Sequence, residues 1–456
     1  MFIKKNISEI LAIFMLSHLI IWTIVPSLAN LNLPLDTIEA LAWGSNLDWG
    51  FNKHPPLSAL AVEIIFIIFG NQDWAYYFLS QIFVITAFYF VYKFSEIFLG
   101  DKKIALISIL LLEGVYFYNY TTPEFNVNIC QLPFWALSVY FAWRCTKSDR
   151  LVDYILMGVF IGLGILSKYL FLYLVIGIKL FFLYLIAKNK KINFYKLMVA
   201  CFVIMIIIAP HLFWLIDNNY TTITYGLMRT GEVKSFVDHF INPLTFLFKQ
   251  VGLLIPLLFM FCLIVKELKI KINFNDEKLI FLILTILTPI ILMFLTSLIL
   301  GVKIRTMWMT PFYLFLGVFI IYIYKKKIIL KNFRKFYIMF LILFIFSPSV
   351  YLGVSLTNDF KRTDYPGKEI AQLVQNKWNN NFTNEIKIVI GDEWAAGNLS
   401  YHLKTRPIWF ESLKDKELID SSNGVIYTGN PDILKQVCPG VFGKINPVGY
   451  CMIGKK

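Results

Sequence analysis

The feature that most limits what this chain can fold into is a succession of apolar stretches, most of them about as long as a membrane is thick. A helix needs about 20 mainly apolar residues to cross the hydrocarbon core of a bilayer. Of the 456 residues, 58% are hydrophobic and only 16% are charged, whereas soluble domains carry about 25% charged residues. The sequence therefore predicts a polytopic α-helical membrane protein.

Eleven segments are predicted to span the membrane. One further apolar stretch, "PPLSALAVEIIFIIFG" (55–70), would form a helix only about 24 Å long, against a hydrocarbon core of about 30 Å. We therefore predict that it is a juxtamembrane helix lying along the outer face, with its apolar side toward the lipid. The eleven predicted spans are 8–28, 74–98, 103–119, 125–143, 152–167, 169–187, 195–214, 244–265, 279–300, 309–324 and 337–355.

The charges of the loops set the predicted orientation. With eleven spans, the lysine-rich N-terminus and the most basic loops all fall on one side of the membrane, which the positive-inside rule makes the cytoplasm. A twelfth span at 55–70 would put the N-terminal lysines opposite all the others. The net charge of +14 thus follows from topology, and nucleic-acid binding, which needs a basic patch on a soluble face, is not expected. The basic loops are 100–103, 144–150, 187–196, 266–278 and 324–335.

The chain begins with an apolar run and ends in a polar segment of about a hundred residues. We expect the N-terminal apolar run to be a retained anchor, because it is longer than the usual 7 to 15 residues of a cleaved signal peptide, the alternative. Residues 1–356 would form the membrane domain, and 357–456 a small α/β domain on the periplasmic side. Strands are predicted at "EIKIVIGD" and "GVIYTGN". Cys438 and Cys451 could form a disulfide outside the cytosol or stay two free thiols.

Several common catalytic signatures are missing from the sequence. It contains no Walker-type phosphate loop, no Gly-rich dinucleotide fingerprint in a βαβ context, and no HExxH, CxxC or GxSxG motif. This argues against ATP-driven transport, redox chemistry and ordinary serine or zinc hydrolysis. The energy for any reaction is expected to arrive with the substrate.

The most informative stretch is "DTIEALAWGSNLDWGFNKHPPLSAL" (36–60), in the first outer loop, 29–73. Asp36 and Glu39, three positions apart, would share one face of a short helix. Lys53 follows on a loop that the Pro55-Pro56 pair stiffens. A carboxylate can take a proton from an attacking hydroxyl, while a lysine can stabilise the charge of a phosphate leaving group. The cluster therefore favours group transfer from a phosphate-linked donor.

This loop resembles the first outer loop of the GT-C-type membrane glycosyltransferases that use polyprenyl-phosphate sugars, the relatives of lipid A aminoarabinose transferase and of the protein O-mannosyltransferases. The shared features are the acidic start, the WG, the Gly-aromatic pair and the K-H-P-P-L run. Other stretches resemble the same family, namely "TTPEFNVN" (121–128), "GLGILSKY" (162–169), "APHLFWLIDNNY" (209–220), "KIRTMW" (303–308) and "GDEWAAGNLSYHLKTRP" (391–407).

The resemblance implies roles for individual residues. Asp36 would be the general base, or would orient the acceptor oxygen. The implied catalytic acids are Asp36, Glu39 and Glu124. The residues implied to bind the donor phosphate are Lys53, Lys168 and Arg305. The residues expected to contact substrate are His54, Trp43, Trp49 and Phe51. Acids near a phosphate could hold Mg²⁺ or Ca²⁺, but a lysine could take the place of the metal, so no cofactor is assigned.

The expected function is therefore transfer of a sugar from undecaprenyl phosphate to lipid A or another envelope glycolipid, with inversion, at the periplasmic face of a bacterial inner membrane. A protein hydroxyl is the alternative acceptor. A transporter or flippase of lipid-linked sugars is the alternative from another class. Transporters usually keep ionisable groups near the bilayer midplane and are often built from repeats, whereas here the acids cluster at outer span ends.

Overall fold

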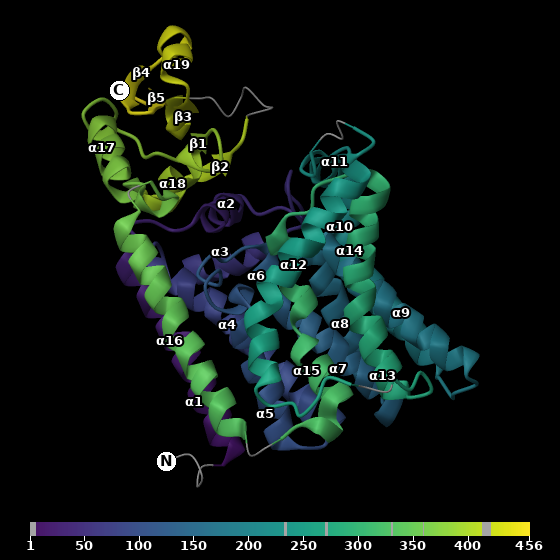
Figure 1. The fold of residues 1–456 in the computed structure, drawn as a ribbon. Helices are drawn as coiled ribbons and strands as arrows, with labels where there is room; N and C mark the ends of the chain where they lie inside the picture. The colour runs from purple at the N-terminus through teal and green to yellow at the C-terminus, as the bar shows by residue number, and fades with distance from the viewer. Residues whose placement is uncertain (1–5, 232–234, 270–271, 330–331, 359, 413–420) are drawn as a thin grey trace.

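The computed structural model describes residues 6–231, 235–269, 272–329, 332–358, 360–412 and 421–456. The chain forms a bundle of helices with a small sheet domain seated on one end (Figure 1). We call this the domain end of the bundle. The N-terminal end of helix α1 lies at the opposite end (Figure 1).

The α-helices of the bundle and of its domain end are α1 (Ile7–Ala29), α2 (Leu35–Gly44), α3 (Leu57–Phe69), α4 (Asp73–Leu99), α5 (Lys102–Leu110), α6 (Val127–Cys130), α7 (Leu132–Ser148), α8 (Leu151–Ser167), α9 (Leu172–Ala187), α10 (Phe194–Asp217), α11 (Thr221–Met228), α12 (Asp238–Cys262), α13 (Glu277–Leu282), α14 (Thr288–Leu300), α15 (Leu316–Tyr324) and α16 (Phe333–Thr357).

Helices coincide with all eleven predicted spans. By length and hydropathy, seven helices of the described chain can cross a membrane, and an eighth span forms if the bent pair 306–313 and 316–327 counts as one. The other three segments, 102–118, 127–148 and 151–167, are shorter or broken by tight turns. They belong to the same bundle, because α7 packs between α4 and α8, and α8 packs along α10. The multi-pass helical fold predicted from the sequence is confirmed.

The basic loops predicted to share one side do lie together, at the end of the bundle away from the sheet domain. Lys147, at the end of α7, pairs with Glu277 of α13 at 2.8 Å. The ammonium of Lys278 donates to the carbonyl of Phe98 at 2.6 Å, and Lys325 donates to the carbonyl of Leu99. Lysine side chains therefore link four different loops or helix ends there.

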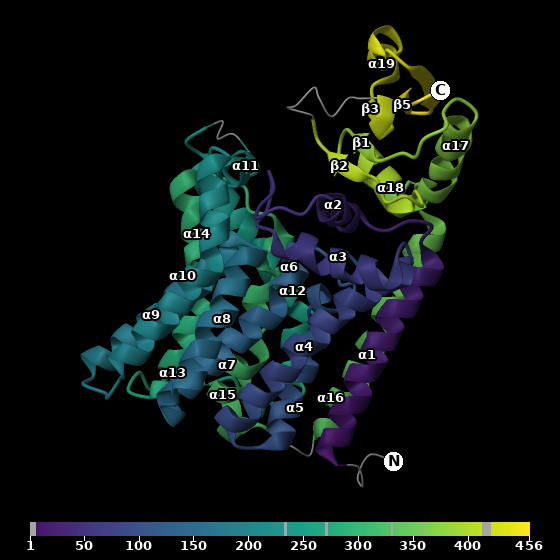
Figure 2. The ribbon, with the colours of Figure 1, turned by 180° about the vertical axis from the view of Figure 1, so that it is seen from behind.

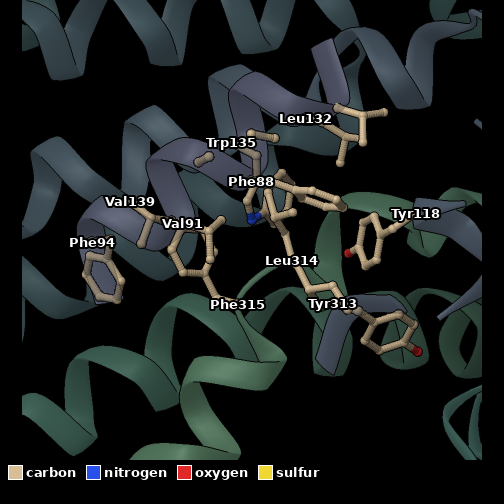
Figure 3. Packing of buried hydrophobic residues seen from close by; sticks show 14 of the residues in the cluster. Phe88, Val91, Phe94, Tyr118, Leu132, Trp135, Val139, Tyr313, Leu314 and Phe315 are labelled. Carbon is tan, nitrogen blue, oxygen red and sulfur yellow. The ribbon is translucent and has the colours of Figure 1, made fainter. Parts of the chain in front are cut away.

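Aromatic side chains fill the middle of the bundle. Figure 3 shows residues of α4 and α7 facing the segment 313–315. Phe94 meets Phe315 edge to face, with ring centroids 5.2 Å apart, and Trp135 stacks on Phe312 at 5.1 Å. Such offset and edge-to-face pairs stabilise a core beyond the area that they bury. The bent pair of helices is thus packed into the bundle centre.

The C-terminal domain is a mixed five-stranded sheet with helices. Strand β1 pairs in parallel with both β2 and β3, and β5 pairs antiparallel with β3 and β4, so the order is β2-β1-β3-β5-β4. The predicted strands at 385–392 and 424–430 correspond to β1 and β3. A disulfide joins Cys438 and Cys451. The elements are β1 (Ile388–Ile390), β2 (Ile408–Phe410), β3 (Val425–Gly429), β4 (Val441–Ile445), β5 (Val448–Ile453), α17 (Gly367–Asn379), α18 (Ala395–His402) and α19 (Pro431–Val437).

Helices α2 and α3 lie across the domain end, between the bundle and the C-terminal domain (Figure 2). The core of the domain continues into α2, because Ala42 and Trp43 belong to the same buried cluster as Val374 and Leu399. Helix α18 packs directly on α2. The predicted division near residue 356, where α16 ends, therefore separates two parts that share a buried interface, and we keep it as our proposed domain boundary.

Candidate active site

A cavity of about 1110 Å³ opens at the domain end, between α2, the loop after it and the ends of several bundle helices. Its lining contains every ionisable residue that the sequence singled out. These residues are Asp36, Glu39, Lys53, His54, Glu124, Lys168 and Arg305. They come from five separate parts of the chain, so the fold has gathered them.

Helix α2 carries the two acids of the first loop. Pro34 precedes its first residue, and proline suits this place because its missing N–H and fixed φ cost nothing at a helix start. Asp36 and Glu39 both face the cavity, as their spacing predicts. The backbone N–H of Asp36 donates to Oε1 of Glu124 at 3.1 Å. Glu124 thus holds the first turn of α2 in place and brings a second carboxylate beside Asp36.

Lys53 lies between two carboxylates. Its ammonium is 2.5 Å from Oε2 of Glu39 and 2.9 Å from Oε1 of Glu393, which belongs to the C-terminal domain. The centroid of the Tyr225 ring in α11 is 6.0 Å from the same ammonium. The C-terminal domain therefore contributes a charged group to the site.

Lys168 sits where α8 stops. Its backbone is extended, which turns the chain into the next helix and leaves the side chain buried against the cavity wall. Its ammonium donates to Oδ1 of Asn128 at 2.6 Å and lies 5.2 Å from the ring of Trp308. Asn128 is itself placed by Asn126, whose side chain caps α6. The predicted segments 121–128, 162–169 and 303–308 thus meet at this lysine.

Burial sets the protonation of these groups. It raises the pKa of Asp36, which Lys168 and Lys53 partly oppose, and it raises the pKa of Glu124, helped by the charge of Asp36. Burial also raises the pKa of Glu39 to about 7, against the pull of Lys53. Desolvation of a carboxylate favours its neutral form. The acids of the site therefore titrate closer to neutral pH than free carboxyls do, as a proton acceptor requires.

The basic and imidazole groups shift as well. Burial lowers the pKa of Lys168 to about 7. Burial would also lower the pKa of Lys53, but the charges of Glu39 and Glu393 outweigh it and the pKa is raised. Burial and the cations of Lys168 and Lys53 lower the pKa of His54 to about 3. His54 is therefore neutral over the physiological range and acts as a polar wall rather than as a proton donor.

Sequence reasoning missed four charged residues of the site. Lys361 and Arg362, which follow α16, and Arg229, which follows α11, also line the cavity. Glu393 completes the pair of carboxylates around Lys53. Glu393 lies in the "GDEWAAGN" stretch and Arg229 in the predicted outer loop 215–243, so their side of the membrane was predicted, but nothing in the sequence brings them to Lys53 and Asp36.

The three aromatic residues predicted to contact substrate lie outside this cavity. Trp43 and Phe51 stack on each other, with centroids 5.1 Å apart, inside the core shared with the C-terminal domain. Trp49 is 55% exposed, and its carbonyl accepts a hydrogen bond from Nδ1 of His211 at 2.6 Å. Trp43 and Phe51 thus pack between α2 and the C-terminal domain and not at this cavity, and their contact with substrate stays a prediction.

A metal site is not apparent in the part of the chain that the structure describes. No group of three or more His, Cys, Asp or Glu side chains is placed to hold an ion. Asp36, Glu39 and Glu124 share the cavity, but Glu39 is paired with Lys53 and Glu124 with the Asp36 backbone.

Residues 53–214 match the family model described as dolichyl-phosphate-mannose-protein mannosyltransferase. Among curated proteins, the chain is 25% identical over 239 residues to the lipid A galacturonosyltransferase RgtD of Rhizobium johnstonii, covering 49% of this chain and 47% of that protein. It is 24% identical over 234 residues to the lipopolysaccharide core galacturonosyltransferase RgtB of the same organism, covering 50% and 46%. The chain thus spans about half the length of these curated relatives.

The fold is shared over nearly the whole chain with a solved structure. The crystal structure of ArnT from Cupriavidus metallidurans bound to undecaprenyl phosphate superposes with a TM-score of 0.64 at 10% identity, covering 97% of this chain and 98% of ArnT. The apo state of ArnT gives a TM-score of 0.63 at 9% identity. The fold is thus that of ArnT, and the match to the family model over residues 53–214 agrees with the resemblance of the first loop to GT-C-type membrane glycosyltransferases.

Proposed function

We propose that the protein transfers a sugar from a polyprenyl phosphate, undecaprenyl phosphate in a bacterium, to lipid A or another envelope glycolipid. The observation that carries the proposal is the cavity at the domain end, where three carboxylates lie among six cationic side chains. The cations are Lys53, Lys168, Arg229, Arg305, Lys361 and Arg362. A site with this excess of positive charge suits an anionic donor, and its acids suit proton removal from an acceptor.

The proposed roles of the cations follow from the burial of each side chain and from its partners. Lys53 and Arg305 bind the donor phosphate; arginine can do so with two parallel N–H groups. When the phosphate arrives, it replaces Glu39 or Glu393 as the partner of Lys53. Lys168, held by Asn128, supports the charge of the leaving phosphate from the cavity wall.

Asp36 is the proposed general base. Within the described chain, its carboxylate accepts no side-chain hydrogen bond, and Glu124 bonds only its backbone, so the carboxylate is available to an acceptor oxygen. It takes the proton as that oxygen attacks the anomeric carbon from the face opposite the phosphate. The bond to the phosphate oxygen breaks, the phosphate leaves with the electron pair, and the configuration inverts.

We propose that the domain end faces the periplasm. The basic loops gather at the other end, as the positive-inside rule expects of the cytoplasmic side. The disulfide between Cys438 and Cys451 also suits an oxidising compartment. A protein hydroxyl is the second candidate acceptor, favoured by the family model's description as a protein mannosyltransferase, while the two curated relatives favour a lipid A or core glycolipid.

The test compares the masses of envelope glycolipids from cells with the gene, without it, and with the Asp36→Asn variant. Lipid A should carry an added sugar mass only with the wild-type gene. Glu369→Gln, a change at an exposed position of α17, is the matched control and should behave as wild type. Identical spectra from all four strains, with each protein present in the membrane, would refute a glycolipid acceptor. An added mass that persists in the Asp36→Asn strain would refute the role of Asp36.

A further inference from the structure

A second, smaller pocket, with a lining separate from that of the active-site cavity, lies at the loop that follows α2. Its volume is about 170 Å³. Three parts of the chain form it: the loop that follows α2, the end of α10, and strand β2 of the C-terminal domain. Its lining residues are Trp43, Asn46, Asp48, Gly50, Phe51, Asn52, Trp214, Trp409 and Glu411.

The aromatic walls of this pocket are fixed in place. The indole N–H of Trp214 donates to Oδ2 of Asp48 at 2.6 Å, and the ring leaves no room for a side chain at Gly50, where a Cβ would come within 2.3 Å of it. Trp409 is tied twice, by its backbone N–H to Ser45 Oγ at 2.9 Å and by its indole N–H to the carbonyl of Gly391 at 3.1 Å. Both indoles are thus held before any ligand arrives, which lowers the entropic cost of binding.

Two buried polar atoms of residues that line the pocket have no hydrogen-bond partner within the described chain. Glu411 accepts from the amide of Asn52 through Oε2 at 3.0 Å. The carbonyl oxygen of that amide is buried without a hydrogen-bond partner among the described residues, and so is the indole N–H of Trp43. Trp43 is only 1% exposed. Each of these buried unpaired groups calls for an explanation, and sugar hydroxyls, which both donate and accept, are groups that could pair with them.

The charge of the pocket contrasts with that of the active-site cavity. Two carboxylates, Asp48 and Glu411, line it, and no cation does within the described chain. A phosphate or a uronic acid would be repelled, whereas a ring with hydroxyl or amine groups would find acceptors at the rim and flat apolar faces on the walls.

We propose that this pocket binds one saccharide ring that carries no anionic group. We assign this ring to the headgroup of the acceptor, and that assignment rests on the proposed function. Asn52 of the pocket directly precedes Lys53 of the active site, so the two sites share one loop. The C-terminal domain then helps to hold the acceptor through Trp409 and Glu411.

The test uses the full-length protein in detergent, with glucose, glucosamine and galacturonate as separate probes and saturation-transfer NMR as the readout. Glucose and glucosamine should bind in the millimolar range. Galacturonate should bind at least about tenfold more weakly, because its carboxylate is repelled by the carboxylates of the pocket, and one such contact is enough for a tenfold loss of affinity. Glu411→Ala should weaken glucose binding by about tenfold or more. Glu411 is exposed, so this change should leave the fold intact.

Two variants make the result specific. Glu369→Ala on α17 is the matched control for loss of an exposed acid and should bind glucose as the wild type does. Lys53→Ala should also keep glucose binding while it abolishes sugar transfer, so failure of this proposal and failure of the proposed function give different patterns. The proposal is overturned if glucose does not bind at its solubility limit, if Glu411→Ala binds it normally, or if galacturonate binds as tightly.

Discussion

We expect Arg406 to be the side chain on which the docking of the C-terminal domain most depends, so Arg406→Ala should weaken that docking. One guanidinium nitrogen is 2.7 Å from the carbonyl of Leu41, near the end of α2, and 2.7 Å from Oε2 of Glu63 in α3. Its plane covers the ring of Phe66, 4.1 Å from the centroid. Arg406 therefore ties the domain to both helices that lie beneath it.

The ion pair is largely buried, because the side chains of Arg406 and Glu63 are only 13% and 14% exposed. Removing one partner of such a pair leaves an uncompensated charge and costs about 3 to 5 kcal/mol. The lost contact with Phe66 adds roughly 0.5 to 1 kcal/mol. We expect Arg406→Ala to weaken docking by about 3 to 5 kcal/mol, since some of these costs overlap.

The assay is hydrogen exchange of the purified protein, followed by mass spectrometry of peptides from α2 and α18. A loss of this size raises the population of the undocked state by about two to four orders of magnitude. Exchange should therefore speed up in α2 and α18 and stay unchanged in α4 and α7. Because α2 carries Asp36 and Glu39, sugar transfer should fall with it.

Two further variants decide how the result is interpreted. Lys404→Ala, an exposed position two residues away, should leave exchange unchanged. The double change Arg406→Met with Glu63→Gln should be milder than Arg406→Ala, because no buried charge is left unpaired. Exchange in Arg406→Ala that rises less than about tenfold, or no more than in Lys404→Ala, would refute the assignment of Arg406 as the main tie.

Two other predictions concern pH and sidedness. Donor binding should tighten by about tenfold or more when the pH falls from about 8 to about 6. Over this range Glu39, whose pKa is raised to about 7, gains a proton and releases Lys53. Lys168, whose pKa is lowered to about 7, becomes positively charged over the same range. Glu39→Gln should flatten this profile, and an unchanged profile would remove Glu39 from the explanation. For sidedness, single cysteines are introduced into a protein without other free cysteines. Leu47→Cys, at a position that is 47% exposed beside α2, should react with a membrane-impermeant maleimide on intact spheroplasts. Lys190→Cys, at the other end of the bundle, should react only after permeabilisation. The reverse pattern would contradict a periplasmic site.

The arrangement of the bundle was largely accessible from the sequence, because its signals are local. Long apolar runs, the side taken by basic loops and the short length of 55–70 are read one segment at a time, and they agree with the helices found. Helix α3 indeed lies across the domain end as a short element (Figure 2). The gathering of Asp36, Lys53, Lys168 and Arg305 was predictable only through resemblance to a family.

What could not be predicted depends on contacts between distant segments. Glu393 and Arg406 lie more than three hundred residues from their partners Lys53 and Glu63, and no spacing rule joins them. The packing of Trp43 and Phe51 against the C-terminal domain could not be predicted for a similar reason, since a sequence does not say which residues a later domain will cover. Strands β2, β4 and β5 were not predicted, and their places in the sheet depend on pairing with β1 and β3.

We propose that the Asp36 carboxylate acts on a donor held by Lys53, and one kinetic comparison separates these two roles. With a purified polyprenyl-phosphate sugar, Asp36→Asn should bind the donor almost as the wild type does while kcat falls by about 10² to 10⁴. Lys53→Ala should weaken donor binding by about thirtyfold or more, as expected when a buried cation that pairs with an anion is removed. Transfer by Asp36→Asn within tenfold of wild type, or unchanged donor affinity in Lys53→Ala, would contradict the proposed site.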